Sequence, residues 1–269
     1  MKAESMPIAT NLFSFMPEET AGPDIQGEDE IRTLLEAGNL PLDRRFELRA
    51  ESCALRLAHA NDKILSLSNS RTRILAHQVE STHRIVNSLN RRFILADEVG
   101  LGKTIEAGLV IKELVYRHAY SRILIVAPAS LLLQWQHEME NKFNERFEVL
   151  DRRFIRRAES LGGRGSNPWQ HCGKAICSLD FIKNRSFGES LASCRWDAVI
   201  FDEAHRLRRD SQRSTLAYTV AEVLSRNTRS LLLLTATPFR GKIEELYYLV
   251  RLVDKNLLGP FQTFYNRFC

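Results

Sequence analysis

The chain has 269 residues, of which 44% are hydrophobic, and it carries 38 Lys and Arg against 33 Asp and Glu. This length and hydrophobic content exclude a wholly disordered chain and predict a globular protein with one large domain or two ordinary ones. No run of 18 or more apolar residues occurs, and the N-terminus lacks the basic-then-apolar order of a secretory signal, so we expect a cytoplasmic protein without membrane contact.

Charge and cysteine content narrow the class of protein further. The net charge of +5 and pI near 9.0 fit a nucleic-acid partner but do not require one. The five cysteines are odd in number and never spaced as C-x-x-C, which predicts ordinary thiols instead of a disulfide framework or a zinc site. Residues 151–164 hold two acids and five arginines, which form either a solvated surface or a DNA contact: Arg152, Arg153, Arg156, Arg157 and Arg164.

The N-terminal part of the chain differs from the rest in composition. Residues 1–45 are polar and contain four prolines, and residues 18–30 hold six acids and no base, which favours a loosely ordered lead-in. A short helix near Asp29–Ala37 is compatible with this pattern. Residues 46–70 have apolar side chains at mixed helical spacing and predict one or two helices that lead into a main domain at residues 71–269.

From Arg92 onward, short apolar runs alternate with amphipathic segments. This alternation is typical of parallel strands buried by crossover helices and predicts an α/β fold. The predicted strands are Phe93–Ala96, Ile123–Ala127, Phe147–Leu150, Lys174–Ser178, Ala198–Phe201 and Ser230–Leu234. The predicted helices are Lys103–Arg117, Leu131–Lys142, Thr215–Ser225 and Ile243–Val253. The glycine-containing stretch Arg156–Gln170 is predicted to be a loop.

The segment Ala96–Thr104 reads ADEVGLGKT, follows an apolar strand and opens an amphipathic helix. Glycines let successive backbone N–H groups face an anion, and the helix N-terminus adds a partial positive charge. A lysine and a hydroxyl at the last two positions suit the outer phosphates and magnesium. Asp97 replaces the first glycine of the strict pattern. The predicted phosphate-loop residues are Asp97, Gly100, Leu101, Gly102, Lys103 and Thr104.

A second apolar strand, about a hundred residues later, delivers two adjacent carboxylates, Asp202 and Glu203. Phosphoryl transfer needs one acid to hold magnesium and another to orient or deprotonate the attacking water. Alone, such a pair is commonly a solvated turn. Because it follows a phosphate loop, it predicts that Asp202 binds magnesium and that Glu203 acts on water.

Two further segments complete the set. The strand that ends near Leu234 is followed by Thr235-Ala236-Thr237-Pro238, whose hydroxyls are placed to sense the nucleotide. Upstream, Gln78 offers an amide that can read both a donor and an acceptor edge of adenine. By itself, a glutamine at such a position is more often a surface residue.

The combination of these segments resembles the first lobe of Swi/Snf-type ATPases of helicase superfamily two, over about Arg71–Cys269. The segments that carry the resemblance are Ile74–Gln78, Leu95–Gly108, Val126–Pro128, Gln134-Trp135, Asp202–His205 and Leu234–Pro238. The detailed form of the motifs is similar to the bacterial branch that holds RNA-polymerase-associated and phage-defence members. The resemblance implies a RecA-like three-layer sandwich with a mostly parallel sheet and a P-loop.

The resemblance also implies roles for single residues. Gln78 would contact adenine, and Lys103 with Gly100 and Gly102 would hold the phosphates of ATP. Thr104 and Asp202 would bind Mg²⁺, and Glu203 would be the catalytic base of a DEAH box. A coupling set of His205, Thr235 and Thr237 would connect nucleotide state to duplex DNA. The segments that line the DNA track in relatives correspond to Pro128, Ser130, Gln134 and Lys183.

Relatives continue into a second RecA-like lobe beyond the position that matches Cys269. That lobe supplies arginines to the γ-phosphate, and such a group is worth roughly 10³ to 10⁵ in rate, or about 4 to 7 kcal/mol of barrier. We therefore expect this chain alone to bind ATP weakly and to turn it over poorly, with the second lobe, absent here, supplied in cis or in trans. RNA polymerase or a defence complex is an expected partner.

Two other functions compete with a DNA-dependent ATPase and translocase. A non-catalytic module that keeps the nucleotide-binding fold and binds DNA or protein is disfavoured by the intact Lys103, Asp202 and Glu203. A small-molecule kinase or transport ATPase with the same phosphate loop is disfavoured by the accompanying Asp-Glu-Ala-His and Thr-Ala-Thr-Pro segments.

Overall fold

The structure is a computed structural model that describes Ser66 and residues 70–268, apart from 73, 99, 163–166, 168, 171, 240 and 241. The predictions for the acidic lead-in at 1–45, its short helix at 29–37 and nearly all of the helical segment at 46–70 lie outside the described residues.

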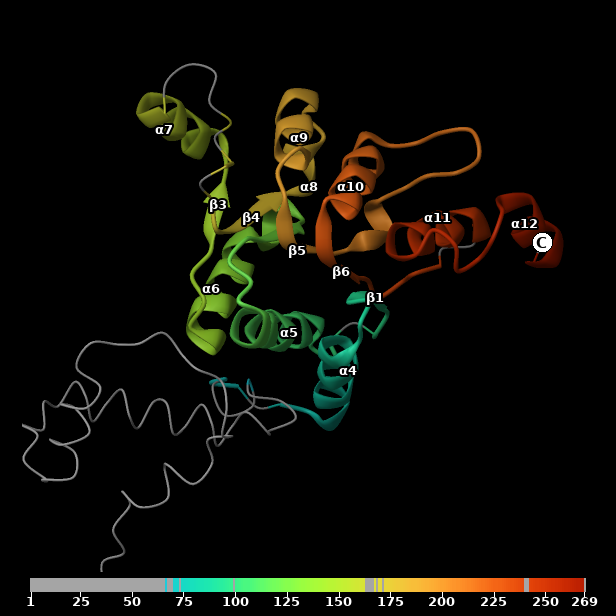
Figure 1. Cartoon of the computed structure of the whole chain (residues 1–269), viewed down its shortest axis with the longest axis horizontal. Coiled ribbons are helices and arrows are strands. Elements are labelled where there is room, and N and C mark those ends of the chain that lie inside the picture. The colour runs from blue at the N-terminus through green and yellow to red at the C-terminus, as the bar shows by residue number, and fades with distance from the viewer. Residues whose placement is uncertain are drawn as a thin grey trace, which may run out of the picture. The chain divides into compact units, whose positions relative to one another are not determined.

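A six-stranded sheet in the order β1-β6-β5-β2-β4-β3 forms the centre of the described chain (Figure 1). Its strands are β1 (Arg92–Leu95), β2 (Ile123–Ala127), β3 (Glu148–Leu150), β4 (Lys174–Ser178), β5 (Trp196–Phe201) and β6 (Thr228–Leu234). Every neighbouring pair is parallel. The six predicted strands and the parallel sheet are therefore confirmed.

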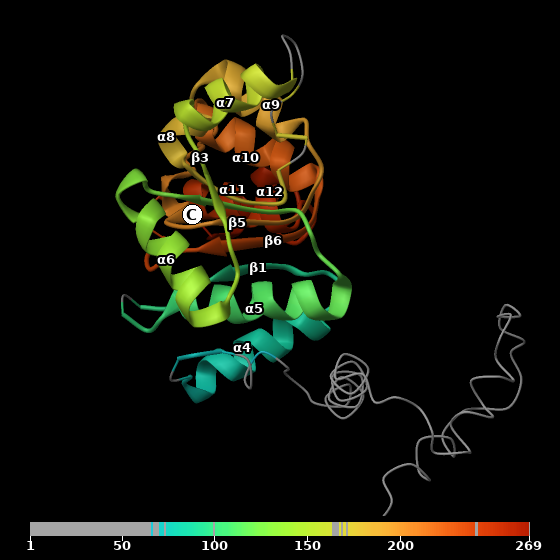
Figure 2. The ribbon, with the colours of Figure 1, turned by 90° about the vertical axis from the view of Figure 1, so that its left-hand side faces the viewer.

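Helices cover both faces of the sheet and make three layers (Figure 2). One face carries α4 (Ala76–Asn87), α5 (Lys103–His118) and α6 (Leu132–Phe143); the other carries α8 (Leu179–Ile182), α9 (Arg185–Ala192), α10 (Leu216–Arg226), α11 (Ile243–Val253) and α12 (Phe261–Phe268). Side chains alternate between the layers: Ile123 and Ile125 of β2 join the core under α5, whereas Leu124 and Val126 join the other core. Both faces of β2 are fully buried, which explains why its sequence is a continuous apolar run.

The loop prediction for Arg156–Gln170 is wrong over its first half, because α7 (Arg152–Gly162) occupies that stretch. The Asp151 carboxylate caps this helix by accepting the backbone N–H groups of Arg153 and Phe154, each at 2.8 Å. Phe154 is buried and stacks on Trp169, with ring centroids 5.7 Å apart. The cap and the buried ring stabilise the first turns of the helix. The glycines on which the loop prediction rested begin only where the helix ends.

The four predicted helices are present as α5, α6, α10 and α11, but the sequence analysis predicts no helix at α4, α8, α9 or α12. Three of these are eight residues or longer, and α4 is the one that bears on the predicted site, because it carries Gln78. Cys172, Cys177 and Cys194 are buried free thiols, as expected. Within the described part of the chain, no helix has the length and apolarity needed to span a membrane.

Candidate nucleotide site

The predicted site segments meet at one edge of the sheet, the edge formed by the carboxyl ends of the strands. The phosphate loop follows β1, the two carboxylates follow β5, and Thr235 follows β6. Backbone hydrogen bonds fasten these ends together: Thr235 N donates to Leu95 O at 3.0 Å, and Asp202 N donates to Val126 O of β2 at 2.8 Å. Ligands of open α/β sheets bind at this edge.

The phosphate loop has the backbone conformation that its glycines predict. Gly100 and Gly102 have φ angles of +90° and +85°, in the left-handed region that favours glycine. A Cβ atom on Gly102 would lie 2.5 Å from Nε2 of Gln78, so a side chain is excluded there. The loop leads directly into α5, and the N-terminus of a helix offers backbone N–H groups and a partial positive charge to an anion.

Lys103 lies across the loop that precedes it. Its ammonium group donates to the backbone carbonyls of Asp97 at 2.8 Å and Glu98 at 2.9 Å. An ammonium group has three donors, so one remains for another acceptor. Lys103 and its neighbour Thr104 are half-buried at the start of α5. The loop, the lysine and the hydroxyl therefore suit a bound triphosphate and its metal ion.

Gln78 is part of this site and is not a surface residue, since its exposed fraction is 3%. Its Nε2 donates to the backbone carbonyl of Leu101 at 3.0 Å, and its Oε1 accepts from the backbone N–H of Leu75 at 3.0 Å. His77 from the same helix also contacts the Leu101 carbonyl, at 3.3 Å. Gln78 thus connects α4 to the phosphate loop through its hydrogen bonds. Its second amide N–H remains able to donate to the base of a nucleotide.

Asp202 is 9% exposed, and each of its carboxylate oxygens accepts a hydrogen bond. Oδ2 accepts from the indole N–H of Trp135 at 2.9 Å, and Oδ1 accepts from the backbone N–H of Glu203 at 2.8 Å. Burial raises the pKa of Asp202, while these two hydrogen bonds oppose the rise by stabilising the ionised form. A buried, oriented carboxylate is a suitable ligand for a divalent cation.

Glu203 has a strained backbone, with φ +51° and ψ +47°. Non-glycine residues rarely adopt this conformation, and it concentrates at functional sites. The Glu203 carboxylate lies 3.0 Å from Nδ1 of His205, which is also 3.3 Å from the Thr235 hydroxyl. That hydroxyl accepts the backbone N–H of Thr237 at 3.2 Å. The structure therefore joins the predicted coupling residues into one chain of contacts that starts at Glu203.

Sequence reasoning missed two side chains of this edge, Trp135 and Glu106. Glu106 is fully buried in the first turn of α5, near Asp97 and Lys103. Burial, and next the neighbouring Asp97 carboxyl, raise the pKa of Glu106 to about 8, and Lys103 opposes the rise. The acidic residue is visible in the sequence, but its burial is not, because α4 was not predicted to cover it.

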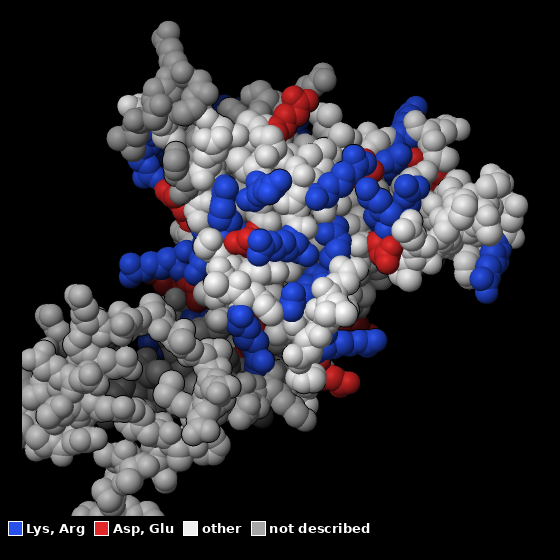
Figure 3. All heavy atoms as spheres, in the orientation of Figure 1, with Lys and Arg blue, Asp and Glu red and all other residues white. Residues whose placement is uncertain are grey.

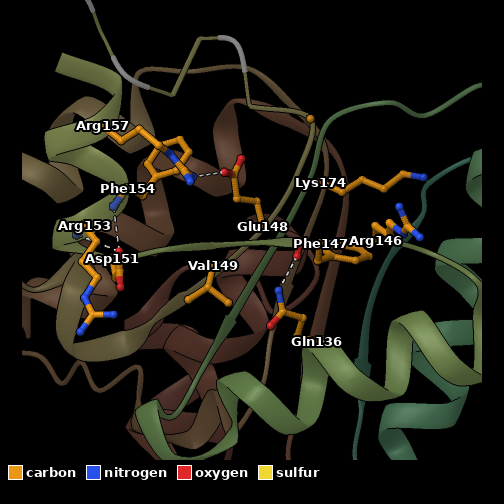
Figure 4. Close-up of a pocket in the computed structure, with 11 residues that line it drawn as sticks. Gln136, Arg146, Phe147, Glu148, Val149, Asp151, Arg153, Phe154, Arg157 and Lys174 are labelled. Carbon is orange, nitrogen blue, oxygen red and sulfur yellow. Dashed lines mark hydrogen bonds and ion pairs between the residues drawn. The ribbon is translucent and has the colours of Figure 1, made fainter. Parts of the chain in front are cut away.

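A hollow of about 720 Å³ lies elsewhere, at the outer edge of β3 (Figure 4). Arg157 crosses its rim and pairs with Glu148 at 2.6 Å, and Lys174 pairs with the buried Glu145. Strands β2 and β4 separate β3 from β5, the strand that carries Asp202. Its charged lining is predominantly basic, and the hollow holds neither the phosphate loop nor the buried Asp202 carboxylate, so it lacks the features of the nucleotide site.

The segments expected to face DNA lie beside the nucleotide site. Ser130 and Gln134 are exposed near the start of α6, whereas Pro128 is buried and Lys183 forms a 2.8 Å ion pair with Asp180. Basic side chains gather over the centre of the face in Figure 3, with acidic ones between them. Such a surface suits a polyanion.

A parallel sheet between two helical layers, with a phosphate loop and a buried carboxylate at its carboxyl edge, defines a RecA-like lobe of the P-loop type. The profile of the SNF2-related domain matches residues 54–269, and the chain belongs to this family. The Swi/Snf-type resemblance is thereby confirmed.

Curated relatives and a solved structure agree with this membership. RNA polymerase-associated protein RapA of Photobacterium profundum is 36% identical over 229 residues, which is 85% of this chain and 23% of RapA. RapA of Proteus mirabilis is 36% identical over 86% of this chain and 24% of its own length. The chain thus spans about a quarter of these relatives. The SWI2/SNF2 ATPase core of Sulfolobus solfataricus in complex with dsDNA shares the fold, with a TM-score of 0.61, 20% identity, and coverage of 74% of this chain and 40% of that one.

Proposed function

We propose that this chain is the ATP-binding lobe of a DNA-dependent ATPase that couples hydrolysis to movement along duplex DNA and to remodelling of DNA-bound complexes. The observation that carries the proposal is the meeting of Lys103, Asp202 and Thr235 at one sheet edge, although they follow three different strands. The family membership and the DNA-bound SWI2/SNF2 core with the same fold support it.

In this proposal the loop and its flanking residues bind ATP. The amides of Gly100 to Gly102, flanked by Asp97, and the Lys103 ammonium hold the phosphates, while the remaining Gln78 amide N–H contacts adenine. Thr104 and Asp202 hold Mg²⁺. The ion, when bound, neutralises negative charge that develops on the phosphates.

Glu203 then acts on the attacking water. Its carboxylate accepts the proton as the water adds to the γ-phosphorus, and the leaving group is ADP. Because His205 contacts both Glu203 and Thr235, a change at the base is transmitted to β6 and Thr237. This contact chain is the proposed coupling element of the DEAH box.

The proposed track uses the exposed Ser130, which precedes α6, and the exposed Gln134 in the first turn of α6 to contact phosphates of duplex DNA. Backbone contacts carry no sequence information and release counterions, so binding tolerates sequence changes and weakens steeply with salt. Because the relatives are RNA polymerase-associated proteins, we propose RNA polymerase, or a phage-defence complex, as a partner in the cytoplasm.

A second RecA-like lobe, in cis or in trans, completes the proposed enzyme. Its arginines would stabilise the transition state, so the present chain alone is expected to turn over ATP at well below about 1 per second. Faster turnover by the isolated chain would show that the lobe is self-sufficient.

The test is the ATPase rate with and without duplex DNA, for the chain alone and supplemented with a second lobe. The proposal expects DNA to stimulate the supplemented protein and Lys103→Ala to abolish the rate. If ATP binds but DNA never stimulates hydrolysis, the chain is a nucleotide-binding interaction module, and the translocation proposal is withdrawn.

A further inference from the structure

Trp135 is a core residue of α6 that reaches the proposed magnesium ligand. It is 2% exposed, and its indole N–H donates to Oδ2 of Asp202 at 2.9 Å. The two residues come from different strand ends, because α6 follows β2 and Asp202 follows β5. An indole has a single polar group, which can only donate. The bond is charge-assisted when the carboxylate is ionised, and such bonds are stronger than neutral ones.

The Asp202 carboxylate is held at both of its oxygens. The second donor is the backbone N–H of Glu203, at 2.8 Å from Oδ1, and the main chain of Asp202 is fixed by its bond to Val126 O. Each carboxylate oxygen has two acceptor sites, so each keeps one for a cation. The backbone donor is inseparable from the chain. Among the described residues, the indole N–H of Trp135 is therefore the side-chain donor that sets the orientation of this carboxylate.

We propose that Trp135 is a positioning residue that holds Asp202 in the orientation in which it binds the magnesium ion of Mg-ATP. This inference rests on the proposed function, because it deepens the role given there to Asp202. Loss of the indole N–H leaves Oδ2 free to rotate away from the metal position. The bound ion then has to orient the carboxylate itself, so magnesium adds less to nucleotide affinity.

A purely structural role for Trp135 would give a different result, and the chain offers a matched control. Trp169 is also fully buried, and its indole N–H donates to the Ser190 hydroxyl at 2.8 Å in the opposite layer of the fold. Trp169→Phe removes the same group from a similar environment without touching the nucleotide edge. Both variants remove a buried indole N–H, but only Trp135→Phe removes one that is bonded to a carboxylate of the nucleotide edge.

The experiment measures binding of a fluorescent ATP analogue with excess Mg²⁺ and with EDTA. Wild type is expected to bind more tightly with Mg²⁺, and Trp135→Phe is expected to lose about 10-fold or more of that gain, the range of a hydrogen bond to a charged group. Its affinity in EDTA stays unchanged, and Trp169→Phe keeps the full gain. In the Asp202→Asn background, Trp135→Phe has no further effect, because the charged acceptor is already gone.

The outcomes separate the inference from the proposed function. If wild type shows no magnesium-dependent gain, the magnesium site itself is withdrawn. If wild type shows the gain and Trp135→Phe retains it, the positioning role is overturned. Should Trp135→Phe not fold, the three indole N–H signals of the wild-type protein provide the test, assigned through Trp169→Phe and Trp196→Phe. The Trp135 signal should shift when Mg²⁺ is added to the nucleotide complex, and an unmoved signal overturns the proposal.

Discussion

The carboxyl edge of the sheet and its β3 edge differ in how their charged side chains are satisfied. At the carboxyl edge, Asp202 is buried with two neutral donors, Lys103 is held by backbone carbonyls, and Glu203 has a strained backbone. At the β3 edge, a hollow of about 720 Å³ is rimmed by the exposed ion pair of Arg157 with Glu148. Exposed ion pairs contribute little to stability, whereas buried groups with a perturbed pKa are typical of functional sites. The chemistry of a site, and not its size, therefore identifies it.

The largest expected difference between the two edges concerns hydrolysis. Glu203→Gln should reduce ATP turnover by about 10² to 10⁴-fold, the usual contribution of a general base, while nucleotide affinity is kept. Glu148→Gln at the β3 edge is the matched control and should leave turnover unchanged. Steady-state rates with the second lobe and duplex DNA present measure both variants. Comparable losses in the two variants would contradict the assignment of Glu203.

Coupling to DNA should depend on the contact chain from Glu203 to Thr235. In His205→Ala this chain is interrupted at the imidazole, which contacts both neighbours. We expect stimulation of ATP hydrolysis by DNA to fall about 10-fold, within the range of allosteric coupling energies, while ATP binding changes less than about twofold. The measurement is the ratio of turnover with and without DNA. An unchanged ratio would remove His205 from the coupling set.

The pH dependence of stability should report on Glu106, the buried carboxyl behind the phosphate loop. The pKa of Glu106 is about 8 in the folded protein against an ordinary value of 4.5, so the folded state keeps a proton that the unfolded state loses. This group therefore lowers stability progressively as the pH rises from 4.5 to 8. Glu106→Gln removes that penalty and should stabilise the protein by about 1 to 3 kcal/mol at pH 8.5, with almost no effect at pH 4.5.

Glu113, seven residues further along α5, is the contrasting control for this measurement. It is equally buried, but it pairs with Arg117 at 2.5 Å and accepts the backbone N–H of Ser66. Glu113→Gln should therefore destabilise the protein at pH 8.5, because it weakens existing contacts. Denaturant unfolding at both pH values, without nucleotide, compares the two variants. Destabilisation of Glu106→Gln at pH 8.5 would show that the carboxylate is needed in its ionised form.

The smallest effect is expected from the arginine cluster beside the β3 edge. Its members include Arg157, which is already paired, and Arg153, which lines the hollow. We change four arginines together to Gln: Arg152, Arg153, Arg156 and Arg157. ATP affinity should stay unchanged. The slope of log DNA affinity against log salt concentration, which counts the ions released on binding, should change by less than about one. A decrease of about two or more in the magnitude of this slope would make α7 part of the DNA track.

The sequence predicts the parts of the fold whose pattern is local. The run Ile123–Ala127 matches β2 residue for residue, and the glycines at 100 and 102 have the expected positive φ angles. Sequence alone does not show long-range burial. The packing of Gln78 against the phosphate loop and the burial of Glu106 both depend on α4. The sequence of α4 is weakly apolar and gives no clear helical signal. The contact between Trp135 and Asp202 spans 67 residues and exists only in the folded sheet.

The most direct measurement of the central claim is calorimetric titration of Mg-ATP into wild type, Lys103→Ala and Arg153→Gln. Lys103→Ala is expected to weaken binding by about 10 to 100-fold, because the ammonium of the phosphate loop is lost, and Arg153→Gln is expected to bind as wild type does. Equal affinity of Lys103→Ala and wild type, or a greater loss in Arg153→Gln, would contradict placement of the nucleotide at the carboxyl edge of the sheet.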